Sequence, residues 1–238
     1  MQISQIFISD ANEDLPDYFS LCMAEAKRLY PEYEHHLYNK ESLRQFIVAH
    51  FDDEVVSAFD KLKPYAYKAD LGRYCLLYIL GGLYLDISIK PIKRIEFSES
   101  VNILAFRDIQ RNSKTSWACS SAVIYAKPNN SVFQTAIDLV VSNCQNNYYG
   151  INSLCTTGPV VFGQALAMNG ANATHIFGDL IVTPQSEDAP AAYFMPDGSK
   201  VALLKPSGHG GNLASLGAKG TNNYGQLWGA KDIFITSE

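Results

Sequence analysis

Polar residues that could bind a ligand or a metal ion gather between residues 64 and 91. Asp70 and Arg73 are three residues apart in a stretch with helical spacing, so their side chains share one face of the predicted helix. Asp86 follows in a short apolar stretch, where burial of an unpaired carboxylate would cost several kcal/mol. We therefore expect Asp86 near the end of a strand, against a cation, a metal ion or a ligand hydroxyl. The alternative is an ordinary surface ion pair on the helix and an aspartate that simply ends a strand.

A pair of glycines joins the two elements that must position these groups. Leucines and tyrosines that recur every three or four residues predict a helix, and Gly81-Gly82 ends it because glycine readily adopts the left-handed conformation. The strict alternation in the following stretch, LYLDISIK, predicts a strand with one apolar face. Its other face carries Tyr84, Asp86 and Ser88. Polar groups from the helix and the strand are therefore expected to converge.

The rest of the first half predicts a Rossmann-like order of strands and helices. Because ligands of open α/β sheets bind beyond the carboxyl ends of the strands, Phe7 and Ile8 at the end of the first strand are expected near the site. His35 and His36 lie on opposite faces of the second predicted strand, which argues against a shared metal site. The predicted elements are a strand over residues 3–9, a helix over 15–30, a strand over 34–38 and helices over 41–50 and 52–62, with Asp52 as an N-cap.

The second half contains a long polar loop and a helix start with capping residues. The loop, residues 107–121, suits an acceptor-binding edge, with Asp108 either binding an acceptor hydroxyl or forming an ion pair. Thr156 or Thr157 is predicted to cap a helix that carries Pro159 in its first turn. The glycine-rich tail lacks P-loop spacing and is predicted to be a mobile flap. The predicted elements are strands over 102–106 and 122–126, helices over 129–143 and 160–168, and strands over 176–184 and 201–206.

Composition favours one globular domain and argues against several classes of protein. The 238 residues are 47% hydrophobic, which is enough for a sizeable core. A net charge of -5 without a basic run argues against nucleic acid as a partner. No stretch approaches the roughly 18 apolar residues of a membrane span, and the N-terminus lacks a signal-peptide pattern, so a soluble cytoplasmic protein is expected. The five scattered cysteines predict reduced, buried thiols rather than disulfides or a zinc site.

The pattern A-D-x-x-R-x-x-x-L-x-x-x-G-G-x-Y-x-D, from Ala69 to Asp86, resembles the sugar-binding region of the family-32 glycosyltransferases. That family includes the yeast initiating mannosyltransferase and bacterial capsule and O-antigen transferases. The stretch is also similar to the glucosylating domains of the large clostridial toxins. The resemblance implies an α/β fold of the GT-A type, a Rossmann-like mixed sheet with flanking helices, in a single domain over residues 1–238. It implies a nucleotide-sugar-binding half over 1–91, an acceptor-side half over 92–206 and a C-terminal flap over the donor at 207–238.

Ser88 departs from the family's pattern, which has the second aspartate of an Asp-x-Asp motif at this position. In the family that aspartate binds the divalent ion directly, and a neutral hydroxyl is a weaker ligand for a hard cation. The resemblance implies a Mn²⁺ or Mg²⁺ ion held by Asp86 and Ser88, with His209 of the C-terminal flap as a third ligand. Either the ion depends on such other groups or the site works without one.

The resemblance also implies roles for individual residues. Asp70, Arg73 and Asp86 are the expected catalytic residues and hold the nucleotide sugar. A Thr-Gly-Pro segment recurs near the acceptor side in the family, and a simple helix start is an equal alternative for it. The donor-binding residues implied are Phe7, Ile8, Tyr84, Asp86, Ser88, Asn223, Tyr224 and Trp228, and the acceptor-binding residues are Asp108, Thr157 and Gly158.

The resemblance therefore implies a hexosyltransferase that retains the anomeric configuration. The resemblance implies a nucleotide-sugar donor, expected to be UDP-linked, and a glycan or lipid-linked glycan acceptor in polysaccharide, capsule or O-antigen synthesis. It implies a cytoplasmic enzyme with peripheral association at the inner face of the cell membrane, and no dedicated protein base. Ser88 leaves a catalytically weak nucleotide-sugar-binding protein as the main alternative. A phosphatase of the haloacid-dehalogenase type lacks its Asp-x-Asp-x-Thr motif here, and a glycoside hydrolase would have only Asp70 to pair with Asp86.

Overall fold

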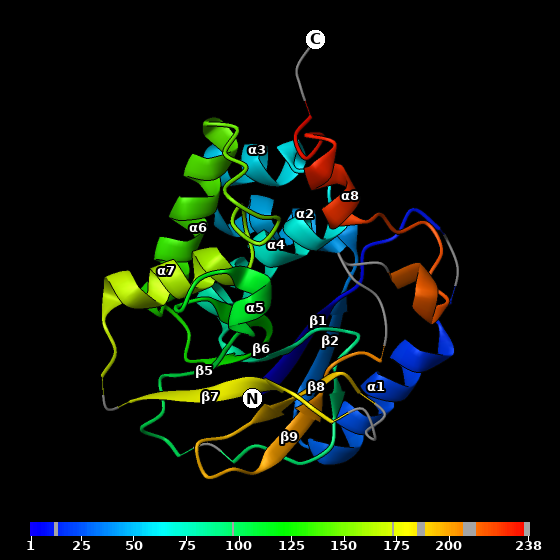
Figure 1. Cartoon of the computed structure of the whole chain (residues 1–238), viewed down its shortest axis with the longest axis vertical. Coiled ribbons are helices and arrows are strands. Elements are labelled where there is room, and N and C mark those ends of the chain that lie inside the picture. The colour runs from blue at the N-terminus through cyan, green and yellow to red at the C-terminus, as the bar shows by residue number, and fades with distance from the viewer. Residues whose placement is uncertain (12–13, 97, 173, 185–188, 207–212, 236–238) are drawn as a thin grey trace.

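One mixed sheet runs through the molecule, with helices on both of its faces (Figure 1). The described residues contribute nine strands to it, in the order β2-β1-β3-β6-β5-β7-β8-β9-β4. The computed structural model describes residues 1–11, 14–96, 98–172, 174–184, 189–206 and 213–235. The strands are β1 (Gln2–Ile6), β2 (Glu34–Tyr38), β3 (Gly82–Leu85), β4 (Lys90–Pro91), β5 (Ile103–Arg107), β6 (Cys119–Ala126), β7 (His175–Val182), β8 (Ala191–Phe194) and β9 (Lys200–Leu203).

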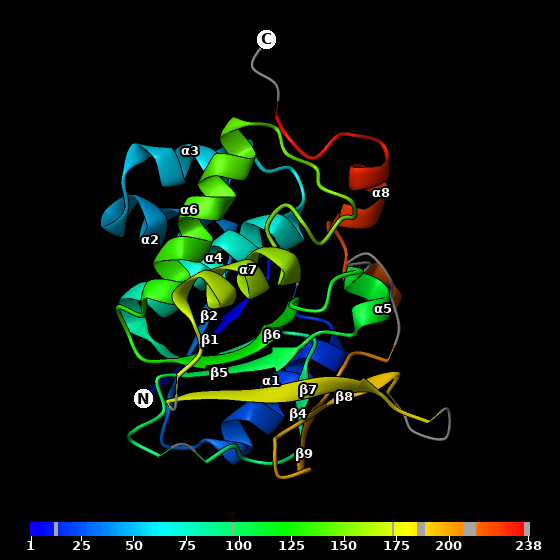
Figure 2. The ribbon, with the colours of Figure 1, turned by 60° about the vertical axis from the view of Figure 1, so that its left-hand side comes forward.

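Helices α2, α3, α4, α6 and α7 cover one face of the sheet, and α1 covers the other (Figure 2). None of the helices in the described ranges combines the length and the apolar character that crossing a membrane requires. The helices are α1 (Asp17–Leu29), α2 (Lys40–His50), α3 (Asp53–Lys61), α4 (Tyr65–Leu80), α5 (Gln110–Ser113), α6 (Ser131–Gln145), α7 (Pro159–Asn169), the 3₁₀ helix η1 (Leu213–Leu216) and α8 (Tyr224–Gly229).

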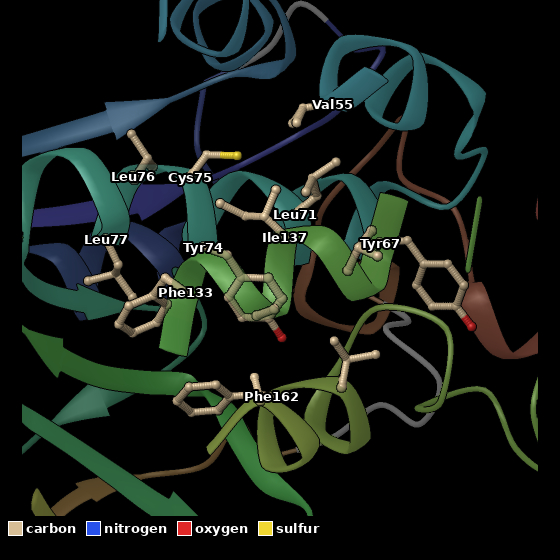
Figure 3. Packing of buried hydrophobic residues seen from close by; sticks show 14 of the residues in the cluster. Val55, Tyr67, Leu71, Tyr74, Cys75, Leu76, Leu77, Phe133, Ile137 and Phe162 are labelled. Carbon is tan, nitrogen blue, oxygen red and sulfur yellow. The ribbon is translucent and has the colours of Figure 1, made fainter. Parts of the chain in front are cut away.

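Strand β3 is buried on both faces because it lies between two hydrophobic layers. Leu83 and Leu85 pack in the cluster that includes residues of α1, whereas Tyr84 belongs to the cluster under α4. In that second cluster Tyr74 of α4 stacks against Phe162 of α7, with 6.0 Å between ring centroids (Figure 3). The strand that precedes Asp86 is therefore fixed from both sides.

Helix α4 ends as its glycine pair predicts. Gly81 is the C-cap residue with a φ of 61°, and Gly82 has a φ of 92°, a region that residues with a side chain rarely occupy. A Cβ atom on Gly81 would lie 2.6 Å from the backbone nitrogen of Pro128. The turn from α4 into β3 therefore requires glycine both for its dihedral angles and for space.

The prediction that the following strand runs to Lys90 is wrong. Strand β3 ends at Leu85, where the Asp86 amide donates a last hydrogen bond to the carbonyl of Ala122 at 2.8 Å. The Ile89 amide then bonds to the Asp86 carbonyl at 2.9 Å and closes a turn. The chain leaves this turn into β4, which pairs with β9 at the far edge of the sheet. The alternation of apolar residues thus continues through a turn that joins two parts of one sheet.

The predicted threonine cap of α7 is also wrong, although Pro159 does occupy the first turn. Gly158 is the N-cap residue, and no side chain caps the helix. The Thr156 hydroxyl instead donates to the carbonyl of Tyr148, and the Thr157 hydroxyl donates to Asp70. Both hydroxyls therefore donate to acceptors elsewhere in the fold.

The described part of the second half contains four elements that were not predicted, namely α5, β8, η1 and α8. The polar loop after β5 contains the short helix α5, and β6 begins at Cys119, three residues before its predicted start. Strand β8 lies between two predicted strands and pairs with β7 and β9. Other predictions are confirmed: Asp52 caps α3 through the Val55 amide, and all five cysteines are free and buried.

Candidate functional site

The Asp86 carboxylate lies at the carboxyl end of β3, between the ends of β1 and β6. Its Oδ1 accepts a hydrogen bond from the Tyr84 hydroxyl at 2.7 Å. The same oxygen lies 3.1 Å from Nη1 of Arg73. The Asp86 side chain is 31% exposed, so the protein holds it on one side and leaves it open to a ligand on the other.

The Arg73 guanidinium lies almost completely buried beside Asp86. Its Nη1 donates to the carbonyl of Ser121, its Nη2 lies 3.3 Å from Asp70 Oδ1, and its central carbon is 4.7 Å from the ring centroid of Tyr84. Burial opposes the positive charge, but Asp86, Tyr84 and Asp70 outweigh it and raise the pKa of Arg73. Arg73 is therefore a permanent cation that links two carboxylates.

The Asp70 carboxylate is buried beneath this pair. Its Oδ2 accepts a hydrogen bond from the Thr157 hydroxyl at 2.8 Å, and its Oδ1 accepts one from the Ser121 hydroxyl at 3.2 Å. A Cβ atom on Gly158 would lie 3.1 Å from Oδ2, so glycine allows this segment to approach closely. Burial raises the pKa of Asp70, and Arg73 and the two hydroxyls offset part of that shift.

Helix α4 and strand β3 thus bring Asp70, Arg73 and Asp86 into one connected group, as their spacing predicts. The alternative of an ordinary surface ion pair does not hold, because the side chains of Asp70 and Arg73 are only 10% and 4% exposed. Buried charges of this kind are found where opposite charges and hydrogen bonds compensate them. Perturbed groups that gather at the end of a central strand are typical of functional sites.

The C-terminal residues of the predicted donor site differ in what they contact. Tyr224 packs against Tyr67 with 5.8 Å between ring centroids, and burial, with the Asp70 and Asp108 charges as smaller contributions, raises the pKa of Tyr224 to about 12. Asn223 caps α8 through the Gly225 and Gln226 amides. Trp228 Nε1 donates to the carbonyl of Tyr149 at 2.8 Å. Tyr224 therefore faces the carboxylates, while Asn223 and Trp228 have structural partners, and their donor roles stay predictions.

The loop after β1 meets the C-terminal segment. Phe7 packs against Phe19 at 5.5 Å, and Ile8 is buried in the large core cluster. Two residues further on, the Asp10 amide donates to the carbonyl of Gly220 at 2.9 Å. The segment after residue 213 is thus tied to the loop in which a donor-binding wall was predicted.

Asp108 follows β5 on the predicted acceptor side, and its amide donates to the carbonyl of Ala118 at 2.8 Å. Burial raises the pKa of Asp108 to about 6. Arg107 pairs with Asp179 of β7 at 2.6 Å, so this arginine has another carboxylate as its partner, and the ion-pair alternative for Asp108 stays a prediction. Thr157 and Gly158 lie against Asp70, and their predicted acceptor contacts stay predictions.

The predicted metal ligands do not form a complete set among the described residues. Ser88 is buried in the turn after Asp86, and its carbonyl accepts a hydrogen bond from the Tyr18 hydroxyl at 3.2 Å. His209 lies outside the described residues. Within the described ranges, no three side chains of His, Cys, Asp or Glu are grouped as a metal site would require.

Two residues near the site were not anticipated from the sequence. Ser121 contributes both its carbonyl and its hydroxyl, and it lies on β6, the antiparallel neighbour of β3. Lys205 follows β9, and burial lowers its pKa, while the nearby Asp86 carboxylate offsets part of that shift. The consecutive serines of CSSAVIYA, unusual in a buried strand, were the only local signal for Ser121.

Comparison with known proteins finds similarity to glycosyltransferases. Residues 16–109 match the family model described as "Glycosyltransferase sugar-binding region containing DXD motif". The structure is similar to "PaToxG Glycosyltransferase", with a TM-score of 0.57 and 20% identity, over 71% of this chain and 69% of that one. That similarity confirms the predicted GT-A type fold.

Two curated proteins share part of the sequence. "Uncharacterized glycosyltransferase L373" of Acanthamoeba polyphaga mimivirus is 30% identical over 101 residues, which is 42% of this chain and 39% of that protein. "Inositol phosphoceramide mannosyltransferase 3" of Schizosaccharomyces pombe is 36% identical over 61 residues, which is 26% of this chain and 17% of that protein. The chain therefore matches well under half the length of either relative. The prediction of a glycosyltransferase is confirmed at the level of its sugar-binding region.

Proposed function

We propose that this chain is a retaining hexosyltransferase that moves a hexose from a nucleotide sugar to a hydroxyl of a glycan or lipid-linked glycan. The observation that carries the proposal is the Asp86 carboxylate, held by Tyr84 and Arg73 within the region that matches the glycosyltransferase family model. It lies beyond the carboxyl end of a strand, which is where open α/β sheets bind their ligands.

Asp86 is the carboxylate proposed to contact the donor. Its side chain is 31% exposed, whereas that of Asp70 is 10% exposed and already accepts hydrogen bonds on both oxygens. In this proposal Asp86 accepts hydrogen bonds from hydroxyls of the donor, and Asp70 fixes Arg73 beneath it. A carboxylate that is already oriented by two neighbours needs little reorganisation when the substrate arrives.

The proposed reaction needs no base from the protein. The bond between the anomeric carbon and the diphosphate oxygen breaks, and its electron pair stays on the diphosphate. The acceptor oxygen forms the new bond on the same face of the sugar, and its proton passes to the departing diphosphate. The site must therefore supply positive charge or hydrogen-bond donors to the diphosphate as that charge develops.

A divalent ion of the kind that the resemblance implies would find an incomplete set of ligands here. Asp86 is the one carboxylate, its Oδ1 is occupied by Tyr84 and Arg73, and Ser88 offers a neutral hydroxyl. Hard divalent cations such as Mn²⁺ and Mg²⁺ are usually held by several oxygen ligands that include carboxylates. The described residues do not fit such an ion on their own, and no step of the proposed reaction is routed through one.

The proposed setting is the synthesis of a surface polysaccharide such as a capsule or O-antigen, in the cytoplasm at the inner face of the cell membrane. The resemblance to transferases of those pathways supports this setting and a UDP-linked donor. The similarity to a named mannosyltransferase supports a hexose as the transferred group and makes a mannose donor a second candidate.

Ser88 favours a second candidate function, a nucleotide-sugar-binding protein with little or no turnover. Such a protein would use the same Asp86 contacts but would not stabilise the departing diphosphate. Protection of the folded chain by a nucleotide sugar, by about 2.7 kcal/mol at a hundredfold excess over Kd, together with no release of nucleoside diphosphate, would identify it.

The test measures release of nucleoside diphosphate from a panel of UDP- and GDP-linked hexoses, with glycan acceptors and with water alone. For the donor that is used, Asp86→Asn should lower kcat at least about a hundredfold, the usual cost of removing a preorganised electrostatic contact. Asp138→Asn is the matched control, because Asp138 lies exposed on α6 and accepts a hydrogen bond from Gln134 of the same helix. It should retain activity within twofold. Full activity of Asp86→Asn, or no nucleotide sugar bound or consumed by the wild type, would refute the proposal.

A further inference from the structure

Lys205 is a cation near the candidate site. It follows β9 and is half-buried, and the described residues give its ammonium group neither a hydrogen bond nor an ion pair. Lys68, which is buried, and Lys61, which is half-buried, differ in this respect. Lys68 donates to the carbonyls of Phe59 and Asp60, and Lys61 donates to the carbonyl of Cys144 at 2.7 Å. A half-buried ammonium without such partners is the arrangement expected where an anionic ligand supplies them.

Strand pairing connects the segment of Lys205 to the turn that follows Asp86. Strand β4 begins after this turn and pairs antiparallel with β9, with Lys90 opposite Leu203 and Pro91 opposite Ala202, and Lys205 is the second residue after Leu203. Lys205 is also near enough to Asp86 for the carboxylate charge to offset part of the lowering of the lysine's pKa by burial.

Ser88 and Lys205 together make the charged groups of this site differ from those of the resembled family. The position that carries a metal-binding carboxylate in the resembled family carries a neutral serine here, and Lys205 follows the strand that pairs with the next strand after this serine. Exchanging a carboxylate and a divalent ion for a hydroxyl and an ammonium leaves one positive charge in either case. That charge is what a departing diphosphate requires.

We propose that the ammonium group of Lys205 binds the diphosphate of the nucleotide-sugar donor beside Asp86 and Ser88, in the place of a divalent ion. The inference rests on the proposed function, because it names the group that receives the diphosphate in the same site. It makes donor binding independent of Mn²⁺ and Mg²⁺. A lysine ammonium suits this role because it is a compact charge with three donors that can follow the phosphate oxygens.

The test is calorimetric titration of UDP and GDP into the chain, in EDTA and separately in Mn²⁺. The wild type should bind one of them equally well in both. Lys205→Met, which keeps the apolar stem, should weaken that binding about tenfold to a hundredfold, as expected for a lost hydrogen bond to a charged group. Lys205→Arg keeps the positive charge, and its affinity for the nucleotide should stay within about threefold of the wild type, because the guanidinium can also donate to phosphate oxygens. Lys93→Met, at an exposed lysine after β4, is the matched control and should bind as the wild type does.

Each result decides the inference. Equal affinity of Lys205→Met and the wild type in EDTA would overturn it, and so would binding of the wild type only in the presence of Mn²⁺. In both cases the proposed function would stand, with the diphosphate held by other groups. Binding of neither nucleotide in either condition would remove the proposed function and the inference with it. If Lys205→Met does not fold, Ser88→Lys, which adds a second ammonium to the same site, tests the charge dependence instead: tighter binding in EDTA supports the inference, and unchanged or weaker binding overturns it.

Discussion

Thr157→Val tests whether the Asp70 carboxylate is ionised and held by its buried neighbours. The Thr157 hydroxyl is fully buried and donates to Asp70 Oδ2 at 2.8 Å. Valine has nearly the same shape but no donor, so Oδ2 would lose this hydrogen bond out of reach of water. Hydrogen bonds to charged groups contribute about 1.5 to 3 kcal/mol. Because Ser121 and Arg73 still hold Oδ1, we expect the free energy of unfolding at pH 7 to fall by about 2 kcal/mol.

The loss should depend on pH in a defined direction. Burial raises the pKa of Asp70, while Arg73 and the Thr157 hydroxyl partly offset the shift. Without the hydroxyl the pKa of Asp70 rises further. A carboxyl group whose pKa is raised on folding contributes stability that is fully present below its unfolded pKa of about 3.9 and is lost as pH rises through its folded pKa. The deficit of Thr157→Val should therefore be smallest near pH 4 and grow toward pH 7.

Urea unfolding of the wild type and the variant at several values between pH 4 and pH 7 measures this deficit. Thr156→Val is the matched control, because Thr156 is equally buried and donates to a neutral carbonyl, that of Tyr148, at 3.2 Å. Its loss should be about 1 kcal/mol and should not change with pH. Equal losses in the two variants, without a dependence on pH, would show that Asp70 is not an ionised acceptor of the Thr157 hydroxyl.

Two further predictions concern the acceptor side and the packing of α7. Asp108→Asn should raise the free energy of unfolding at pH 7 by about 1 to 2 kcal/mol. The pKa of Asp108 is raised to about 6, so ionisation of its carboxyl group costs stability as pH rises from about 4 to 6. Urea unfolding should show that the gain vanishes near pH 4, and a gain unchanged at pH 4 would contradict this prediction. Gly163→Ala should cost about 1 to 3 kcal/mol in thermal or urea unfolding, because its Cβ would lie 1.9 Å from the carbonyl oxygen of Trp117. Gly229→Ala, with no atom within 4 Å of the new Cβ, should be neutral or slightly stabilising, and similar losses in both variants would rule out the steric explanation.

The local elements around the site could be predicted because their causes lie within a few residues. Helical spacing and a glycine pair were enough to define α4 and its end at Gly81. The end of β3 at Leu85 could not be predicted in the same way. It depends on the Asp86 amide, whose acceptor is the carbonyl of Ala122 on a strand formed much later in the chain. The apolar alternation continues beyond that point and gives no sign of the turn.

The polar partners of the site were harder to predict because they are distant in sequence. Thr157 was expected to cap the helix that follows it, a role decided by adjacent residues. Its hydroxyl instead bonds to Asp70, 87 residues away. The hydroxyl goes to the buried carboxylate because leaving a charged acceptor without donors costs more than leaving a helix end without a side-chain cap. The spacing of residues does not show which acceptor a hydroxyl will choose. Lys205 was not predicted as a site residue because it is also distant in sequence from Asp86.

The region that matches the family model does not contain the whole of its own site. Strand β3 lies within residues 16–109, yet both of its neighbours in the sheet, β1 and β6, lie outside that range. The two hydroxyls that hold the Asp70 carboxylate, from Ser121 and Thr157, also lie outside it. Because an isolated strand leaves its backbone groups unpaired and a buried carboxylate without donors is unstable, residues 16–109 alone cannot keep Asp86 and Arg73 in this arrangement. The orientation of the sugar-binding residues is therefore set by the second half of the chain, and changes at Ser121 or Thr157 should alter donor binding without contacting the donor.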